Sequence, residues 1–132
     1  MNTLKQLYST DFFTLSIEED WICATWFGFQ LKDSVPSGCK EILKALKKYH
    51  LFKVLNDSSR SKGLWNTDWV ANEWFPGLLQ EGLKKFAWVV SPDLLCQGET
   101  EKVVLSAPAS SVIIMFKDTN EAKRWLKDKT IV

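Results

Sequence analysis

Two short apolar segments of this chain end in polar residues that could carry chemistry. Segment 52–55 leads into the polar run 56–59, and segment 86–90 leads into 91–93. A hydroxyl or carboxylate exposed beside helix amino ends can bind a ligand, and a hydroxyl there can accept a phosphate that gains charge-assisted hydrogen bonds. The candidates for a phosphorylation or ligand site are Asp57, Ser58, Ser59, Ser91 and Asp93.

A simpler interpretation of these residues stays open. Aspartate and serine at the end of a strand often satisfy neighbouring backbone groups in Asx-type turns. Neither Ser91 nor Asp93 makes an evident acid–base pair with Asp57. The polar runs are therefore either a site or two turns.

The remaining residues exclude the familiar enzyme classes. His50 is the only histidine and follows an amphipathic segment, so a Ser-His-Asp triad has no evident partner residues. Cysteine and histidine do not occur in the close pairs of a zinc site. The six glycines do not cluster into a phosphate-binding loop. We expect a protein that is not an enzyme and uses neither a metal nor a cofactor.

Size and charge narrow the class of protein further. A chain of 132 residues with 45% hydrophobic and 25% charged residues fits one globular domain, residues 1–132. A net charge of +1 argues against nucleic acid as the main partner. No apolar run is long enough to span a membrane. Cys23, Cys39 and Cys96 are odd in number and widely spaced, which predicts reduced thiols and a cytoplasmic location.

Apolar spacing predicts an α/β fold. Alternation over 13–17 and the β-favouring run 21–27 predict an antiparallel hairpin. The runs 52–55, 86–90 and 111–116 predict three further strands with helical segments between them, as in βαβ units. We expect one mixed sheet of about five strands with helices packed on it. The carboxyl ends of its parallel strands should border the binding crevice.

The tryptophan-rich helix predicted after residue 66 has an apolar surface wider than one sheet face needs. Pro76 cannot donate a backbone hydrogen bond, so this helix should kink or restart there. Large aromatic residues either fill a core or form binding hot spots. The candidates for a partner surface or a pocket are Trp65, Trp69, Trp74, Phe75 and Leu79. Lys84 and Lys85, which follow the helix, are expected at a solvated helix end.

Several stretches resemble the STAS domains of sulfate transporters and anti-sigma-factor antagonists, in their SpoIIAA-like branch. Those carrying the resemblance are the strand running into 57–59, the strand ending at 91–92, the strand 112–116 and the helix opening at 118–122. The tryptophan-containing segments 68–69, 72–76 and 86–89 are similar to those of a tryptophan-rich bacterial subgroup. The resemblance covers roughly residues 10 to 128 and implies a mixed sheet with packed helices.

The resemblance also implies functions. In the antagonists, the serine of an Asp-Ser-Ser-Gly motif is phosphorylated by a partner kinase, and the matching position here is Ser59, preceded by Ser58. The glycine of that motif is replaced by Arg60, and residues 61–66 delay the next helix. A neighbouring structural class, the CRAL-TRIO lipid carriers, implies an apolar-ligand pocket under Trp65 and Trp69.

We therefore expect a non-enzymatic regulatory domain that binds a protein partner or itself, as a homodimer. The interface is expected on the helix from Trp69 to Leu83. A serine-phosphorylated antagonist and a small carrier of an apolar ligand are the alternatives.

Overall fold

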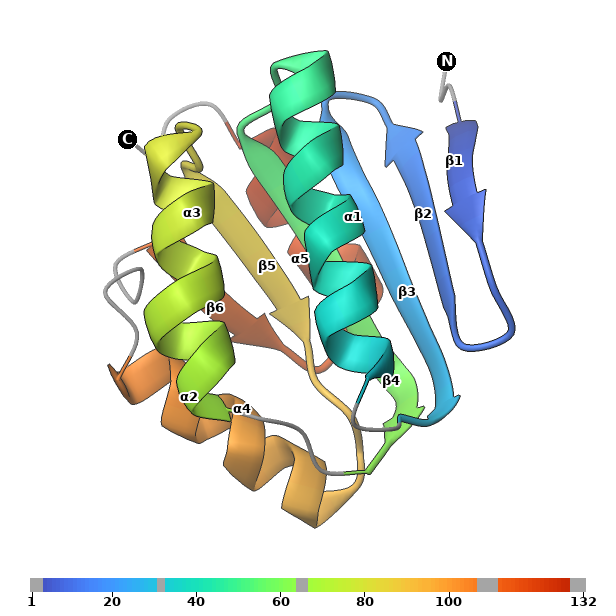
Figure 1. Cartoon of the computed structure of the whole chain (residues 1–132), viewed down its shortest axis with the longest axis vertical. Coiled ribbons are helices and arrows are strands. Elements are labelled where there is room, and N and C mark those ends of the chain that lie inside the picture. The colour runs from blue at the N-terminus through green and yellow to red at the C-terminus, as the bar shows by residue number, and fades with distance from the viewer. Residues whose placement is uncertain (1–3, 31–32, 64–66, 107–111, 129–132) are drawn as a thin grey trace.

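The computed structural model describes residues 4–30, 33–63, 67–106 and 112–128, and Figure 1 shows their arrangement. One six-stranded sheet runs through the molecule, and each strand neighbours the next strand in the sequence. The strands are β1 (Leu4–Ser9), β2 (Phe13–Glu18), β3 (Trp21–Phe29), β4 (Lys53–Lys62), β5 (Lys85–Val89) and β6 (Ile113–Phe116). The helical segments are α1 (Ser34–Tyr49), α2 (Thr67–Trp69), the π-helical η1 (Val70–Trp74), α3 (Phe75–Gln80), α4 (Leu94–Ser106) and α5 (Thr119–Lys127).

The sheet is mixed, as predicted. Strands β1, β2 and β3 pair antiparallel, whereas β3, β4, β5 and β6 pair in parallel. The additional strand is β1, which lies at the edge beyond the predicted hairpin. Its sequence has only an incomplete apolar alternation, and its pairing with β2 is what makes it a strand.

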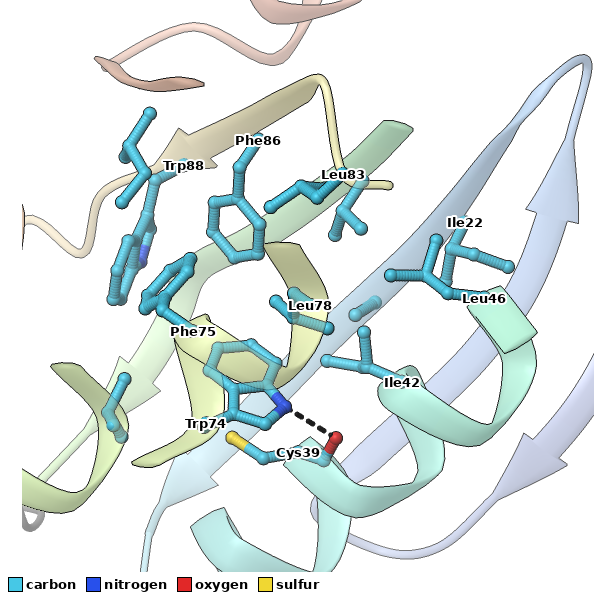
Figure 2. Close-up of a cluster of buried hydrophobic side chains, with 14 of the residues drawn as sticks. Ile22, Cys39, Ile42, Leu46, Trp74, Phe75, Leu78, Leu83, Phe86 and Trp88 are labelled. Atoms are coloured by element: carbon cyan, nitrogen blue, oxygen red, sulfur yellow. Dashed lines mark hydrogen bonds between the residues drawn. The ribbon is translucent and has the colours of Figure 1, made fainter. Parts of the chain in front are cut away.

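Helices cover both faces of the sheet, and two separate cores result. Figure 1 shows α1 and α3 in front of the strands and α5 behind them. The larger core lies under α1, η1 and α3, and Figure 2 shows part of it. The smaller one contains Trp21, Leu55 and Leu126 and lies under α5. The segments on the larger core also form the walls of the site described below.

The tryptophan-rich helix changes its hydrogen-bonding pattern just before Pro76. The backbone N–H of Phe75 donates to the carbonyl of Val70, five residues earlier, which is the π-helical pattern. The α-helix α3 then begins at Phe75, with Pro76 in its first turn, where a missing N–H costs little. The predicted restart of the helix is confirmed.

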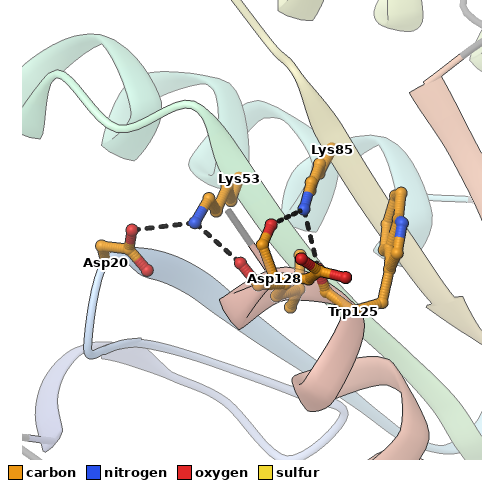
Figure 3. Close-up of polar contacts among 6 residues, drawn as sticks. Asp20, Lys53, Lys85, Trp125 and Asp128 are labelled. Atoms are coloured by element: carbon orange, nitrogen blue, oxygen red, sulfur yellow. Dashed lines mark hydrogen bonds and ion pairs between the residues drawn. The ribbon is translucent and has the colours of Figure 1, made fainter. Parts of the chain in front are cut away.

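Two lysines hold the end of α5 against the sheet (Figure 3). Lys53 and Lys85 are direct neighbours on β4 and β5. Lys53 Nζ donates to the Leu126 carbonyl at 2.7 Å, and Lys85 Nζ donates to the carbonyls of Trp125 and Asp128 at 2.8 and 2.6 Å. The last carbonyl groups of a helix have no hydrogen-bond partner within it, and the two lysines supply one. A positive charge at the carboxyl end of a helix also interacts favourably with the helix dipole.

The expected solvated position of Lys85 is therefore wrong. Lys85 begins β5 and is buried. Burial, together with the nearby charge of Lys53, lowers the pKa of its ammonium group. The contacts with α5 come from the tertiary structure, and a pair of adjacent lysines in the sequence gives no sign of them.

Close packing of β3 against α1 makes one glycine essential. A Cβ atom on Gly38 would lie 2.4 Å from Cη2 of Trp26. In contrast, Gly98 on α4 has nothing within 4 Å of such an atom. Alanine gains about 1 kcal/mol of helix propensity over glycine, and overpacking costs about 1–3 kcal/mol.

We expect Gly38→Ala to lower the free energy of unfolding by about 1–2 kcal/mol, because the clash outweighs the propensity gain. The control Gly98→Ala should raise it by up to about 1 kcal/mol. Urea denaturation of the two variants measures both changes. If Gly38→Ala is as stable as Gly98→Ala, Trp26 does not pack on α1 as described.

Candidate functional site

The first polar run lies inside a strand rather than after it. β4 continues to Lys62, so the prediction that the strand ends before Asp57 is wrong. β4 pairs with β5 only as far as Asp57, which lies opposite Val89, and continues beside β3 alone. The two strands therefore separate at the carboxyl end of β5, and the neighbouring helices enclose a hollow there.

A bulge in β4 directs neighbouring serines to different surroundings. Thr25 pairs with Asp57 and Phe27 with Arg60, so Ser58 and Ser59 together face one residue of β3. Such an extra residue locally reorients side chains. Ser58 lines the hollow, and Ser59 does not.

Asp57 and Ser59 form a local turn-like structure. The carboxylate oxygen Oδ1 of Asp57 accepts hydrogen bonds from Ser59 N–H at 2.9 Å and from Ser59 Oγ at 2.6 Å. This is the simpler interpretation that the sequence left open. A phosphate on Ser59 would stand beside this carboxylate and be repelled by it.

The second polar run ties β5 to α4 and β4. Asp93 Oδ1 accepts hydrogen bonds from the N–H groups of Leu95 and Cys96, at 3.0 and 3.1 Å, and so caps the start of α4. Ser91 is buried, donates to the Ser61 carbonyl at 2.7 Å and accepts from Asp93 N–H. α4 therefore begins at Leu94, directly after this capping aspartate.

We call the space between the separated strands and the helices the strand-end hollow. α1, η1 and α4 form its helical walls. Its polar lining includes Gln30, Asn56, Ser58, Ser61, Ser91 and Thr100, and the aromatic residues of its lining that the structure describes are Trp26, Trp74 and Trp88. The crevice predicted at the carboxyl ends of the parallel strands is therefore present.

Each indole that lines the hollow is fixed by a hydrogen bond. Trp26 Nε1 donates to Asn56 Oδ1 at 2.8 Å, and Trp88 Nε1 donates to Ser58 Oγ at 3.2 Å. Trp74 Nε1 donates to the carbonyl of Cys39 at 2.8 Å, as Figure 2 shows. These bonds hold the rings in place and leave their apolar faces to shape the hollow.

The cysteines beside the hollow are poor nucleophiles. Burial raises the pKa of the Cys39 thiol well above its ordinary value, and burial with the nearby Asp93 raises that of Cys96. A thiol must lose its proton to attack or to bind a metal. In the part of the chain that the structure describes, no three His, Cys, Asp or Glu residues gather where a metal ion could be held.

The described residues among those predicted as a partner surface or a pocket pack in or against the larger core, and Trp74 also lines the hollow. Trp74 and Phe75 are buried in the larger core, where Phe75 packs against Phe86 with ring centroids 4.9 Å apart. Trp69 and Leu79 are partly buried and pack against the same core. Trp65 lies outside the described residues. Contacts with α1 and α4, and the packing of Phe75 on Phe86 of β5, cover much of this helix, and its role as an interface stays a prediction.

The lining residues that were not predicted as site residues include Asn56 and Thr100. Both are buried, although their side chains are polar. Asn56 is the first residue of the polar run 56–59 and directly follows an apolar segment, which was the available signal, since buried polar groups require partners. Thr100 gave no comparable signal in the sequence.

Comparison with known proteins identifies the fold. No family model matches the sequence, and no curated protein matches it. The crystal structure of an uncharacterized protein of the DUF3478 family from Shewanella loihica PV-4, which has a SpoIIAA-like fold, superposes with a TM-score of 0.50. The alignment covers 95% of this chain and 93% of the other at 15% sequence identity. The fold is SpoIIAA-like.

The SpoIIAA-like fold agrees with the resemblance inferred from the sequence, although this degree of identity shows the fold alone. The serine that matches the antagonist phosphorylation site, Ser59, lies within β4. The next helical segment begins only at Thr67 and is three residues long before its pattern changes. Ser59 is therefore not at a helix amino end.

We expect Ser59→Asp to be less stable than Ser59→Asn by about 1 kcal/mol, because two like charges a few ångströms apart in water repel by that amount. Both variants lose the serine hydroxyl, and the part of their difference that salt reduces reports the charge. Thermal unfolding at low and high salt measures it, and salt should reduce the difference. Equal stability of the two variants at low salt would show that Asp57 does not oppose a negative group at this position.

Proposed function

We propose that this SpoIIAA-like domain is a non-enzymatic regulatory domain that acts by self-association. The observation that carries the proposal is an apolar surface on α4 and β6. Among the described residues, most of the exposed large hydrophobic side chains lie there, and we call them the α4–β6 surface: Leu94, Leu95, Leu105 and Met115, which are 81, 69, 85 and 39% exposed.

α4 carries apolar residues on opposite sides. Its inner side buries Cys96 and Val103 against the core, yet Leu94 and Leu105 on its outer side remain in solvent. At 100° per residue these two leucines lie within about 20° of each other on the helix. Exposed leucines gathered on one side of a helix mark an interaction site more often than scattered single ones do, and the exposed Glu101 lies between these two. The outer side of α4 therefore has the mixed apolar and charged composition of an interface.

A second copy of the chain fits this surface. β6 is the last strand in the order of the sheet, so among the described elements its outer edge has no strand partner. Pairing β6 with β6 of another copy about a two-fold axis would extend the sheet and bring the two α4–β6 surfaces together. Glu101 and Lys102 are both exposed on α4, so the surface does not present one sign of charge to its copy.

The shape beside β6 also suits a partner. A groove of about 250 Å³ lies between α4 and β6, with Gln97, Glu101 and Met115 in its lining. A side chain of the second copy could enter this groove. The hollow at the strand ends is smaller, at about 40 Å³, whereas ligand pockets usually measure about 300–1,000 Å³. The size of the hollow favours self-association over carriage of a lipid-like molecule.

Other observations support the remaining parts of the proposal. The carboxylates of Asp57 and Asp93 serve local backbone groups, which leaves them little part in acid–base chemistry. Cys23, Cys39 and Cys96 are all free thiols, which suits a reducing compartment such as the cytoplasm. No described helix combines the length and the apolar character needed to cross a bilayer.

We expect the wild-type protein to form a dimer at micromolar concentration and Leu94→Glu/Leu105→Glu to be monomeric, because burying two carboxylates in an apolar interface is costly. Sedimentation velocity measures the association, and circular dichroism checks that the variant is folded. Phe29→Glu is the matched control, because Phe29 is 70% exposed and lies on β3, outside the α4–β6 surface.

Three results would contradict the proposal. The wild-type protein could be monomeric at every concentration tested. Phe29→Glu could abolish the dimer, which would place the interface elsewhere. The double variant could remain dimeric while folded, which would exclude α4 from the interface.

A further inference from the structure

The strand-end hollow contains a buried amide that the protein uses only in part. Asn56 is 3% exposed and lines the hollow. Its Oδ1 accepts the hydrogen bond from Trp26 Nε1. An indole nitrogen can only donate, so this bond fixes which end of the amide faces Trp26. The other end, Nδ2 with two N–H donors, has no protein partner among the described residues.

Ser58 and Thr100 complete a set of complementary polar groups. Ser58 lies two residues from Asn56 on β4 and accepts from Trp88 Nε1, so its hydroxyl hydrogen remains available to an acceptor. Thr100 Oγ1 donates to the carbonyl of Cys96 at 3.0 Å and keeps its lone pairs. The hollow therefore offers donors from the sheet side and an acceptor from α4.

The walls and the charge of the hollow define what these groups can recognise. Trp26, Trp74 and Trp88 provide flat apolar surfaces, which favour a planar molecule. Among the described lining residues Lys62 is the charged one, and it is exposed. Moving an ion into a buried site without a paired charge is costly, so the lining selects an uncharged molecule.

The size of the hollow sets an upper limit on the molecule. The space open to the centre of a water-sized sphere is about 40 Å³. A cavity needs about 10–15 Å³ to hold one water, whereas one that binds benzene measures about 150 Å³. The hollow therefore admits about three waters, or one polar group of a planar molecule whose ring stays at the open side. An acyl chain would not fit without a rearrangement of α1, η1 or α4.

We propose that the strand-end hollow binds a small, uncharged, planar molecule with a carbonyl or ring-nitrogen acceptor, which Asn56 Nδ2 recognises. Ser58 donates a second hydrogen bond to the molecule, and Thr100 Oγ1 accepts one from an N–H group on it. The site is formed by one chain, so binding does not depend on self-association.

Nicotinamide is a suitable probe because it is a neutral planar ring with a carboxamide. Nicotinate has the same ring and a negative charge, and toluene has a ring without polar groups. Titration of ¹⁵N-labelled protein, followed by NMR, reports on the Asn56 side-chain amide and on the indole N–H groups of Trp26, Trp74 and Trp88. We expect saturable shifts of the Asn56 amide and of these indoles with nicotinamide, and weaker binding of nicotinate and toluene.

Two variants separate recognition from folding. Asn56→Asp keeps an oxygen for Trp26 Nε1 and removes both donors, and Thr100→Val removes the acceptor with little change in shape. Each should weaken nicotinamide about three- to tenfold, the loss expected for one hydrogen bond. Asn72→Asp, the same change at an exposed position on η1, is the matched control and should bind like the wild type.

The proposal is overturned if nicotinamide gives no saturable shift up to about 10 mM, since even millimolar affinities would then be excluded. It is also overturned if nicotinate binds as tightly or toluene binds equally well. If Asn56→Asp does not fold, Thr100→Val and the wild-type Asn56 amide signal decide the outcome. Unchanged affinity in a folded Asn56→Asp would show that this amide does not contact the molecule.

Discussion

The position of the Trp26 side chain is the constraint on which most of the structure around the hollow depends. Its indole comes from β3, packs on Phe13 with ring centroids 4.4 Å apart, and lies where any side chain at Gly38 would clash. Its N–H is held by Asn56 of β4. One side chain thus sets how closely α1 approaches the sheet, satisfies half of a buried amide, and forms a wall of the hollow. A smaller residue would leave the amide without a partner and α1 without its packing surface.

The hollow itself results from the unequal lengths of two parallel strands. β5 ends at Val89, whereas β4 continues to Lys62 beside β3. Where β4 runs past the end of β5, its backbone groups still need hydrogen-bond partners. The Ser91 hydroxyl supplies one by donating to the Ser61 carbonyl. Polar residues at the strand ends therefore have two different roles. Asp57 and Asp93 stabilise local backbone, while Asn56 and Ser58 keep hydrogen-bonding capacity toward the hollow.

The helices differ in how completely their apolar sides are covered by other elements. η1 and α3 pack against α1 and α4 and supply the larger core with Trp74 and Phe75, while Trp69 and Leu79 stay partly buried. The end of α5 is held by Lys53 and Lys85. The outer side of α4 has no comparable cover among the described residues. A helix with a wide apolar surface thus need not form an interface when other elements pack on two of its sides. An interface is better sought where leucines remain exposed.

The sequence by itself determined the mixed sheet, the hairpin of β2 and β3, the restart of the helix at Pro76 and the edge of the sheet at which a site would lie. These follow from local rules: apolar periodicity, the missing N–H of proline, and the direction of parallel strands. It did not determine that β4 passes through Asp57, that Trp74 and Phe75 are core residues, or that Lys85 is buried. Those outcomes depend on which segments pack against each residue. Whether a side chain of a given type is buried or exposed is decided by contacts between residues far apart in the chain. Only the tertiary structure decides them.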